Sequence, residues 1–140
     1  MPCAFCQIVA GEVPAAVVFQ DSDCLAFLDN RPLFPGHCLV IPRAHYETLD
    51  SLPDKLAGGL FGRARCLSTV VEKALEAEGS FVAINNRVSQ SVPHLHIHVV
   101  PRRKGDGLKG FFWPRRKYAD APEMERVRTL LENAWDQICR

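Results

Sequence analysis

The seven residues from 94 to 100 alternate histidines with apolar side chains, and this pattern constrains the fold more than any other in the sequence. They are His94-Leu95-His96-Ile97-His98-Val99-Val100. Because side chains alternate between the two faces of a β-strand, a strand here places three imidazoles on one face, about 6.5 Å apart, and three apolar side chains on the other. Three histidines in strict alternation are hard to explain by packing alone. The segment therefore predicts a catalytic strand over 94–100.

The rest of the chain predicts four more strands and two main helices. Further runs of strand character, bounded by turn residues, are 17–20, 24–28, 37–41 and 81–85. Apolar residues recur at helical spacing between about 50 and 79. A second helix is predicted from Asp120 to Ile138, where Asp120 and Glu123 resemble a capping box. This order favours an α+β fold with a mostly antiparallel five-stranded sheet.

Length and composition limit the class of protein. The 140 residues suit one domain, 1–140, with a C-terminal extension over about 104–140. No apolar run reaches the roughly 20 residues of a membrane-spanning helix, and the N-terminus lacks a signal-peptide pattern, so we expect a cytoplasmic protein with no membrane partner. The cytoplasm keeps thiols reduced, and Cys24, Cys38 and Cys66 are interpreted as small core residues.

Positive charge is concentrated in one segment of a chain whose net charge is only +1. Between 102 and 117 there are seven basic residues and a single acid, Asp106. A short basic segment suits a phosphate-bearing small ligand better than a long nucleic acid, which would require a wider basic face. A solvated surface segment is the alternative interpretation.

The alternating histidines by themselves leave two chemistries open. Imidazole is the commonest transition-metal ligand, and a neutral imidazole is also a nucleophile near pH 7 when a hydrogen bond at its other nitrogen fixes the tautomer. Cys3 and Cys6 add two thiols at C-x-x-C spacing, without a second pair to complete a four-cysteine site. A redox role for this pair is weaker, since the βαβ context of thioredoxin-like proteins is missing.

Three separated blocks of sequence resemble the histidine-triad (HIT) family of nucleotide hydrolases and transferases. They are Leu25–Asp29, Pro35–His45, and Asn85–Arg103 around the histidines. The resemblance implies a HIT-like fold, a homodimer that shares its sheet, and attack on the α-phosphate of a purine nucleotide. The substrate would be a dinucleoside polyphosphate or a nucleoside phosphoramidate.

The resemblance also implies roles for individual residues. His96 matches the nucleophile that forms a nucleotidyl-histidine, which water then hydrolyses, and His98 matches the histidine that contacts the phosphate or leaving group. The other residues implied in catalysis or nucleotide binding are Phe27, Asp29, His37, Asn85 or Asn86, Gln90 and Ser91. Asp29 matches the carboxylate that holds the ribose hydroxyls. Taken alone, without the resemblance, Asp29 and His37 are better interpreted as turn residues.

Some family members complete a structural zinc site with two histidines beside a C-x-x-C pair. The matching set here is Cys3, Cys6, His45 and His94, which implies a bound Zn²⁺ and gives His94 a scaffold role. One position departs from the family pattern: Ser89 stands where the family commonly has glycine, so this loop is expected to differ in backbone shape.

Several functional alternatives stay open at the level of sequence. A phosphorylase would release the nucleotide with phosphate instead of water, a binding protein would have lost catalysis, and a metalloenzyme would use the three histidines as metal ligands. The aromatic and basic segment 105–117 either covers the site or packs against a second subunit.

Overall fold

The computed structural model describes residues 2–109 and 115–139, which fall into two compact units. The first unit is Met1–Asp106 and holds all the strands, and the second is Gly107–Arg140 and holds one helix. The aromatic residues Phe111, Phe112 and Trp113, for which a covering or dimer role is expected, lie outside the described residues.

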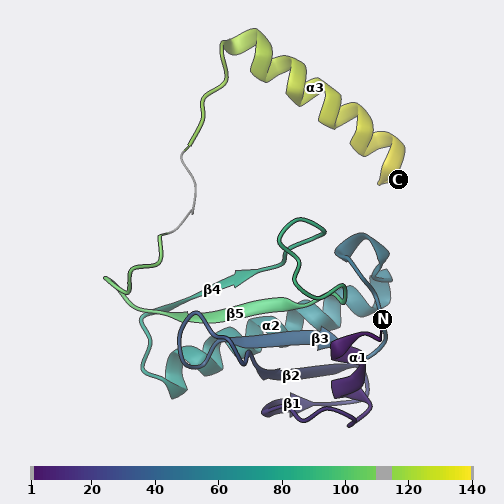
Figure 1. Ribbon diagram of the computed structural model, residues 1–140. Coiled ribbons are helices and arrows are strands. Elements are labelled where there is room, and N and C mark those ends of the chain that lie inside the picture. The colour runs from purple at the N-terminus through teal and green to yellow at the C-terminus, as the bar shows by residue number, and fades with distance from the viewer. Residues whose placement is uncertain (1, 110–114, 140) are drawn as a thin grey trace. The chain divides into compact units, whose positions relative to one another are not determined.

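One antiparallel sheet of five strands forms the first unit (Figure 1). The strands are β1 (Val17–Gln20), β2 (Cys24–Leu28), β3 (Cys38–Pro42), β4 (Gly79–Ala83) and β5 (Ile97–Arg102). Their order across the sheet is β1-β2-β3-β5-β4, and every neighbouring pair is antiparallel. This confirms the predicted α+β class with an antiparallel five-stranded sheet, whereas the sharing of the sheet between two copies stays a prediction.

The histidine segment is shifted relative to the predicted strand 94–100. β5 begins only at Ile97 and continues to Arg102, because the preceding residues make other hydrogen bonds. The backbone N–H of His94 donates to the carbonyl of Val92 at 2.8 Å, and that of Leu95 donates to the carbonyl of Tyr46 at 2.6 Å. The predicted division of faces is nevertheless correct: Leu95 and its alternate neighbours lie in the core, away from the imidazoles.

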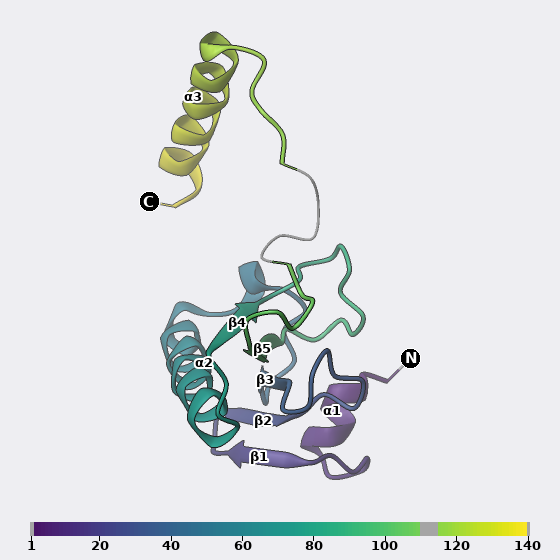
Figure 2. The same ribbon diagram turned by 90° about the vertical axis from the view of Figure 1, so that its left-hand side faces the viewer.

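The two faces of the sheet are covered by different helices (Figure 2). α2 (Asp54–Ala74) packs on the face that carries Leu95, Ile97 and Val99. The short helix α1 (Ala4–Val9) packs on the other face, where Phe5 joins a second apolar cluster with Leu25, Phe27, Leu39 and Ile41. The imidazoles face α1, so the functional side of the sheet is the one that this short helix covers.

α2 confirms the helical periodicity but not all its details. Its buried residues Leu60, Ala64, Leu67 and Val71 belong to the predicted apolar face. The helix ends at Ala74 and is preceded by a separate 3₁₀ turn, Leu49–Ser51, so it is shorter than predicted. The interpretation of Cys66 as a core residue is wrong, because two residues rotate a helix by about 200° and so carry Cys66 from the buried face of Ala64 to the exposed side.

The second unit contains α3 (Ala121–Ile138). Asp120 caps it as predicted, since its side chain accepts the Glu123 N–H at 2.8 Å, and the Glu123 carboxylate accepts the N–H of Ala119, one residue before the cap. None of the helices in the described part of the chain has the length and apolar character required to cross a membrane.

Candidate active site and metal centre

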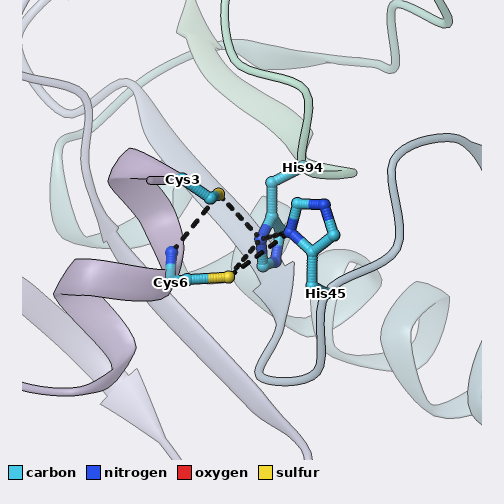
Figure 3. Close-up of side chains that lie close together, drawn as sticks. All are labelled: Cys3, Cys6, His45 and His94. Atoms are coloured by element: carbon cyan, nitrogen blue, oxygen red, sulfur yellow. Dashed lines mark hydrogen bonds between the residues drawn. The ribbon is translucent and has the colours of Figure 1, made fainter. Parts of the chain in front are cut away.

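Two groups of side chains lie next to each other on the α1 side of the sheet. The first brings together Cys3, Cys6, His45 and His94, the four residues that the sequence assigns to zinc (Figure 3). Their ligand atoms all lie within 4.8 Å of one another. Cys3 is the N-cap of α1, where its Sγ accepts the backbone N–H of Cys6, so the short helix itself sets the positions of both sulfurs.

The geometry of these four residues fits a tetrahedral zinc ion. Zinc bond lengths of 2.3 Å to sulfur and 2.0–2.1 Å to nitrogen give tetrahedral edges of about 3.6 Å between S and N and about 3.3 Å between N and N. The Sγ atom of Cys6 lies 3.3 Å from His45 Nδ1 and 3.6 Å from His94 Nδ1, and the two Nδ1 atoms are 3.2 Å apart. The Sγ atom of Cys3 is 3.4 Å from His94 Nδ1. The group could therefore hold a metal ion.

The surroundings of His94 fix its tautomer in the form that a metal requires. Its Nε2 atom lies 2.9 Å from the carbonyl oxygen of Pro42, which can only accept a hydrogen bond. Nε2 therefore carries the proton, and the lone pair of Nδ1 is directed toward the sulfurs. Such a hydrogen bond on the distal nitrogen is what orients most metal-binding histidines.

The second group surrounds a cavity of about 960 Å³. Most of its lining is apolar, including Phe5 and Ile8 of α1 and Phe27 of β2. The polar side chains on the lining are Asp29, Asn30, Arg31, Ser91, His96 and His98. An apolar hollow with few convergent polar groups is typical of a small-molecule site.

His96 is held with one nitrogen available for chemistry. The residue is 3% exposed, and its Nδ1 atom lies 2.7 Å from the backbone carbonyl oxygen of His94. Since a carbonyl only accepts, Nδ1 carries the proton and Nε2 keeps its lone pair. The edge of the Phe5 ring packs against the imidazole, with centroids 5.1 Å apart, and restricts its rotation. The site thus contains an imidazole held in one orientation on the lining of the cavity.

A chain of hydrogen bonds connects His98 to the backbone of the loop before β3. The Leu33 N–H donates to His37 Nδ1 at 3.0 Å, so His37 carries its proton on Nε2. That Nε2 lies 2.9 Å from His98 Nδ1 and donates to it, which leaves the proton of His98 on Nε2. Burial, and then the neighbouring His96 and His37, lower the pKa of His98 to about 4. Burial likewise lowers the pKa of His37, against the opposing charge of Asp29.

The same hydrogen bonds disfavour a second metal site, which Asp29, His37 and His98 would form. Ligand atoms of Asp29, His37 and His98 lie within 4.8 Å of one another, and the Asp29 carboxylate is 3.6 Å from His37 Nε2. Nε2 of His37 already carries a proton, because Nδ1 accepts from the backbone, so it has no lone pair for a metal. With the protons placed in this way, His37 offers no lone pair to a metal on these three residues.

The loop after β4 holds its polar side chains in local hydrogen bonds. Gln90 accepts the N–H of Arg87 at 2.8 Å and donates to the carbonyl of Glu47 at 2.6 Å. Asn85 donates to the carbonyl of Ser89, and the side chain of Asn86 accepts the N–H of Leu49 at 2.8 Å. Among the described residues that line the cavity, Ser91 is present, whereas Asn85, Asn86, Gln90 and His37 are not.

Ser89 adopts the left-handed backbone conformation, with φ of 62°. Glycine occupies this region without the steric penalty of a side chain. The loop therefore keeps a glycine-like turn at this position in spite of the serine.

A family model described as HIT domain matches residues 10–105. The chain belongs to the HIT family. It is 44% identical over 108 residues to an uncharacterized HIT-like protein of Methanocaldococcus jannaschii, a match that covers 75% of this chain and 82% of the relative. It is 35% identical over 108 residues to the adenylylsulfatase HINT3 of Arabidopsis thaliana, with 76% of this chain and 55% of the plant protein covered. The adenosine 5'-monophosphoramidase HNT1 of Candida albicans is 28% identical over 144 residues, 99% of this chain and 92% of the yeast protein. The family thus includes hydrolases of adenine nucleotides.

Solved HIT structures share the fold, and one of those structures holds zinc. A HIT protein of Bacillus subtilis superposes with a TM-score of 0.85 at 32% identity, with 95% of this chain and 96% of that chain covered. A zinc-bound histidine-triad protein of Mycobacterium smegmatis has a TM-score of 0.74 at 35% identity and covers 96% and 98% of the two chains.

Two parts of this HIT site are not found by sequence reasoning. Phe5 contacts His94 and His96 from a helix of only six residues, which is too short for a periodic pattern. The position of Phe5 between Cys3 and Cys6 is the one sequence feature that could have indicated its role in the site. The backbone N–H of Leu33 leaves no trace in the sequence at all, since every residue except proline carries one.

Proposed function

We propose that the protein is a nucleotide hydrolase or transferase that attacks the α-phosphate of a purine nucleotide with Nε2 of His96. The observation that carries the proposal is the orientation of that imidazole: Nδ1 is held on the His94 carbonyl, and the residue lines the large cavity. A neutral imidazole oriented in this way is an activated nucleophile. Substrates of the proposed class are dinucleoside polyphosphates, adenylyl sulfate and nucleoside phosphoramidates, in keeping with the names of the plant and yeast relatives.

The remaining residues of the cavity have proposed supporting roles. The ribose hydroxyls would bond to Asp29, and the base would stack among the apolar side chains of Phe5, Ile8 and Phe27. Ser91 and the Nε2 proton of His98 would donate to the phosphate oxygens. Gln90, Asn85 and Asn86 would position the loop that carries Ser91, since their amides bond within the loop or to the segment 47–49.

The decisive experiment traps the covalent intermediate. The protein is mixed with diadenosine tetraphosphate or adenosine phosphoramidate and quenched in alkaline denaturant, because the N–P bond is acid-sensitive. Intact mass spectrometry should show one added adenylyl group in the wild type and none in His96→Ala. Val88→Ala is the matched control, since Val88 is 81% exposed in the same region of the chain. Equal turnover by the wild type and His96→Ala would refute the assignment.

The same incubation shows whether water or inorganic phosphate accepts the nucleotidyl group. With inorganic phosphate in the mixture, a hydrolase releases AMP and a phosphorylase releases ADP. Binding of AMP without any turnover of either substrate would indicate a binding protein instead of an enzyme.

We also propose that Cys3, Cys6, His45 and His94 bind a structural zinc ion. Zinc would supply the cross-link that holds α1 against the sheet, and the donor set and its spacing support this assignment. Metal analysis should find one equivalent in the wild type and in Cys66→Ser, whose thiol is exposed and distant from the site in sequence, and much less in Cys3→Ser. A content below about half an equivalent in chelator-free wild type would count against the site.

A further inference from the structure

The hydrogen-bond chain that begins at the backbone of Leu33 has a consequence for the leaving group. Each bond in the chain has one direction, because a backbone N–H can only donate. Leu33 donates to His37 Nδ1, and His37 Nε2 donates to His98 Nδ1. Both imidazoles are therefore fixed as neutral Nε2–H tautomers.

These hydrogen bonds do not accommodate a second proton on the imidazole of His98. If Nδ1 of His98 were protonated, its N–H would face the N–H of His37 across 2.9 Å. If His37 moved its proton to Nδ1 to relieve that conflict, the new N–H would face the N–H of Leu33 across 3.0 Å. Either arrangement places two donors against each other in a buried setting, where an unmade hydrogen bond is costly. The other titratable groups near the pair are Asp29, whose carboxylate lies 3.6 Å from His37 Nε2, and His96, whose ring packs on His98.

The other residues that line the cavity do not replace the missing acid. His96 is the proposed nucleophile, with Nδ1 directed to the His94 carbonyl, and the Ser91 hydroxyl is too weak an acid to release a proton near pH 7. Arg31 is the single cationic side chain on the described lining, and a guanidinium keeps its proton in proteins. Asp29 is a carboxylate, which accepts. The described lining thus offers hydrogen bonds and one fixed positive charge, but no transferable proton.

We propose that the site acts on nucleotides whose leaving group is a weakly basic anion, such as a sulfate, phosphate or carboxylate in anhydride linkage to the α-phosphate, in preference to phosphoramidates and alkyl esters. The inference rests on the proposed function and narrows its substrate class. His98 then contacts the phosphate as a neutral donor and is not a general acid.

The bonds made and broken balance without an acid. The lone pair of His96 Nε2 forms the N–P bond as the P–O bond to the leaving group breaks, and the leaving oxygen keeps both electrons and departs as an anion. His96 then carries the nucleotidyl group on Nε2 and its original proton on Nδ1, with a positive charge. Water attacks phosphorus, the N–P electrons return to Nε2, and the proton of the water passes to solvent, which yields the nucleoside monophosphate.

The dependence of rate on the leaving group tests this directly. Adenosine 5'-monophosphate esters of substituted phenols, from 4-nitrophenol to phenol, keep the nucleotide constant while the basicity of the leaving group rises. Because kcat/KM reports the steps up to the first irreversible one, it follows nucleotidyl transfer to His96. Without an acid, kcat/KM should fall by roughly tenfold for each unit of leaving-group pKa. A fall of less than about twofold per unit would show that a proton is delivered and would overturn the proposal.

The tautomers can be observed independently of turnover. In a long-range ¹H–¹⁵N correlation spectrum, with His98 assigned by its loss in His98→Gln, we expect the neutral Nε2–H form from pH 8 to about pH 5, both with and without AMP. An imidazolium at pH 6 to 7 in the AMP complex would overturn the proposal even if variants fail to fold.

Replacement of His37 supplies the reciprocal test. His37→Ala and His37→Gln remove the locked donor and let His98 Nδ1 take a proton, so the dependence of kcat/KM on the leaving group should become shallower in both. A purely structural role would lower all rates by the same factor and leave the slope unchanged, which would count against the proposal. If no ester reacts and no adduct forms on His96, the proposed function itself fails, whereas turnover with a flat dependence refutes only the present inference.

Discussion

Replacement of Ser89 by glycine should stabilise the protein, although most substitutions by glycine destabilise. Ser89 has φ of 62°, in the left-handed region, where a residue with a side chain pays roughly 1–2 kcal/mol. Its carbonyl accepts a hydrogen bond from Asn85, which the substitution keeps. Glycine has greater backbone freedom in the unfolded chain, and this costs about 0.5–1 kcal/mol. The net expectation is a gain of about 0.5 kcal/mol in the free energy of unfolding.

A matched substitution separates the two contributions. Ser22 is also exposed and lies in the bend between β1 and β2, but its φ is not positive. Ser22→Gly therefore has only the destabilising effect of the greater backbone freedom of glycine in the unfolded chain. The difference between the two variants is therefore the left-handed penalty itself, about 1–2 kcal/mol, or about 3–6 °C in Tm for a chain of this size.

Urea unfolding at pH 7 and constant metal content measures this difference, with thermal unfolding as a second reading. If Ser89→Gly loses as much stability as Ser22→Gly, the left-handed conformation is not strained and the reasoning is refuted. The result also bears on the family pattern, since glycine at this position would then require an explanation other than backbone conformation.

Three further predictions concern individual residues of the first unit. The pKa of His98 is about 4 in the folded protein against the ordinary 6.5, so between these pH values the unfolded chain binds a proton that the folded protein does not. Neutral His98 therefore contributes fully to the free energy of unfolding above pH 6.5, and this contribution is lost as pH falls toward 4. The free energies of unfolding of the wild type and His98→Gln, measured by urea titration, should diverge by about 2 kcal/mol between pH 6.5 and pH 4, after allowance for partial exposure. Gly36→Ala should cost more than Gly11→Ala, but by only about 0.5–1 kcal/mol, since both have positive φ and only the former would overlap the end of the exposed Leu75 side chain, which can turn away. Phe5→Ala should cost about 3–5 kcal/mol in unfolding and also lower kcat, because the ring that restricts His96 is lost.

The sequence predicts the sheet and the metal group well because each depends on local or strongly patterned chemistry. Alternation sets which face of the histidine segment is apolar, and Leu95 is fully buried as that pattern requires. Cys3, Cys6, His45 and His94 come from three separate segments, yet the structure brings them within ligand distance of one another as the resemblance implies.

The details that were missed depend on contacts between distant segments. The start of β5 depends on the carbonyl of Tyr46, a residue far away in the sequence, which accepts the N–H of Leu95 outside the ladder. The polar loop residues follow the same principle: Gln90 is bonded to Glu47, which is far away in the sequence. Residue type shows that such groups can bond, but only the fold determines to which partner.

The proposed metal group and the proposed nucleophile consist of different side chains, yet they are joined through two residues. His94 directs its Nδ1 to the sulfurs and its backbone carbonyl to Nδ1 of His96, so any displacement of the metal group also displaces the acceptor that fixes the nucleophile. Phe5 lies between the two cysteines on α1 and packs against both imidazoles, with centroids 5.9 Å from His94 and 5.1 Å from His96. A zinc ion that cross-links this six-residue helix to the sheet would therefore do more than stabilise the N-terminus. It would also help to fix the tautomer and rotation of the histidine that we propose as the nucleophile.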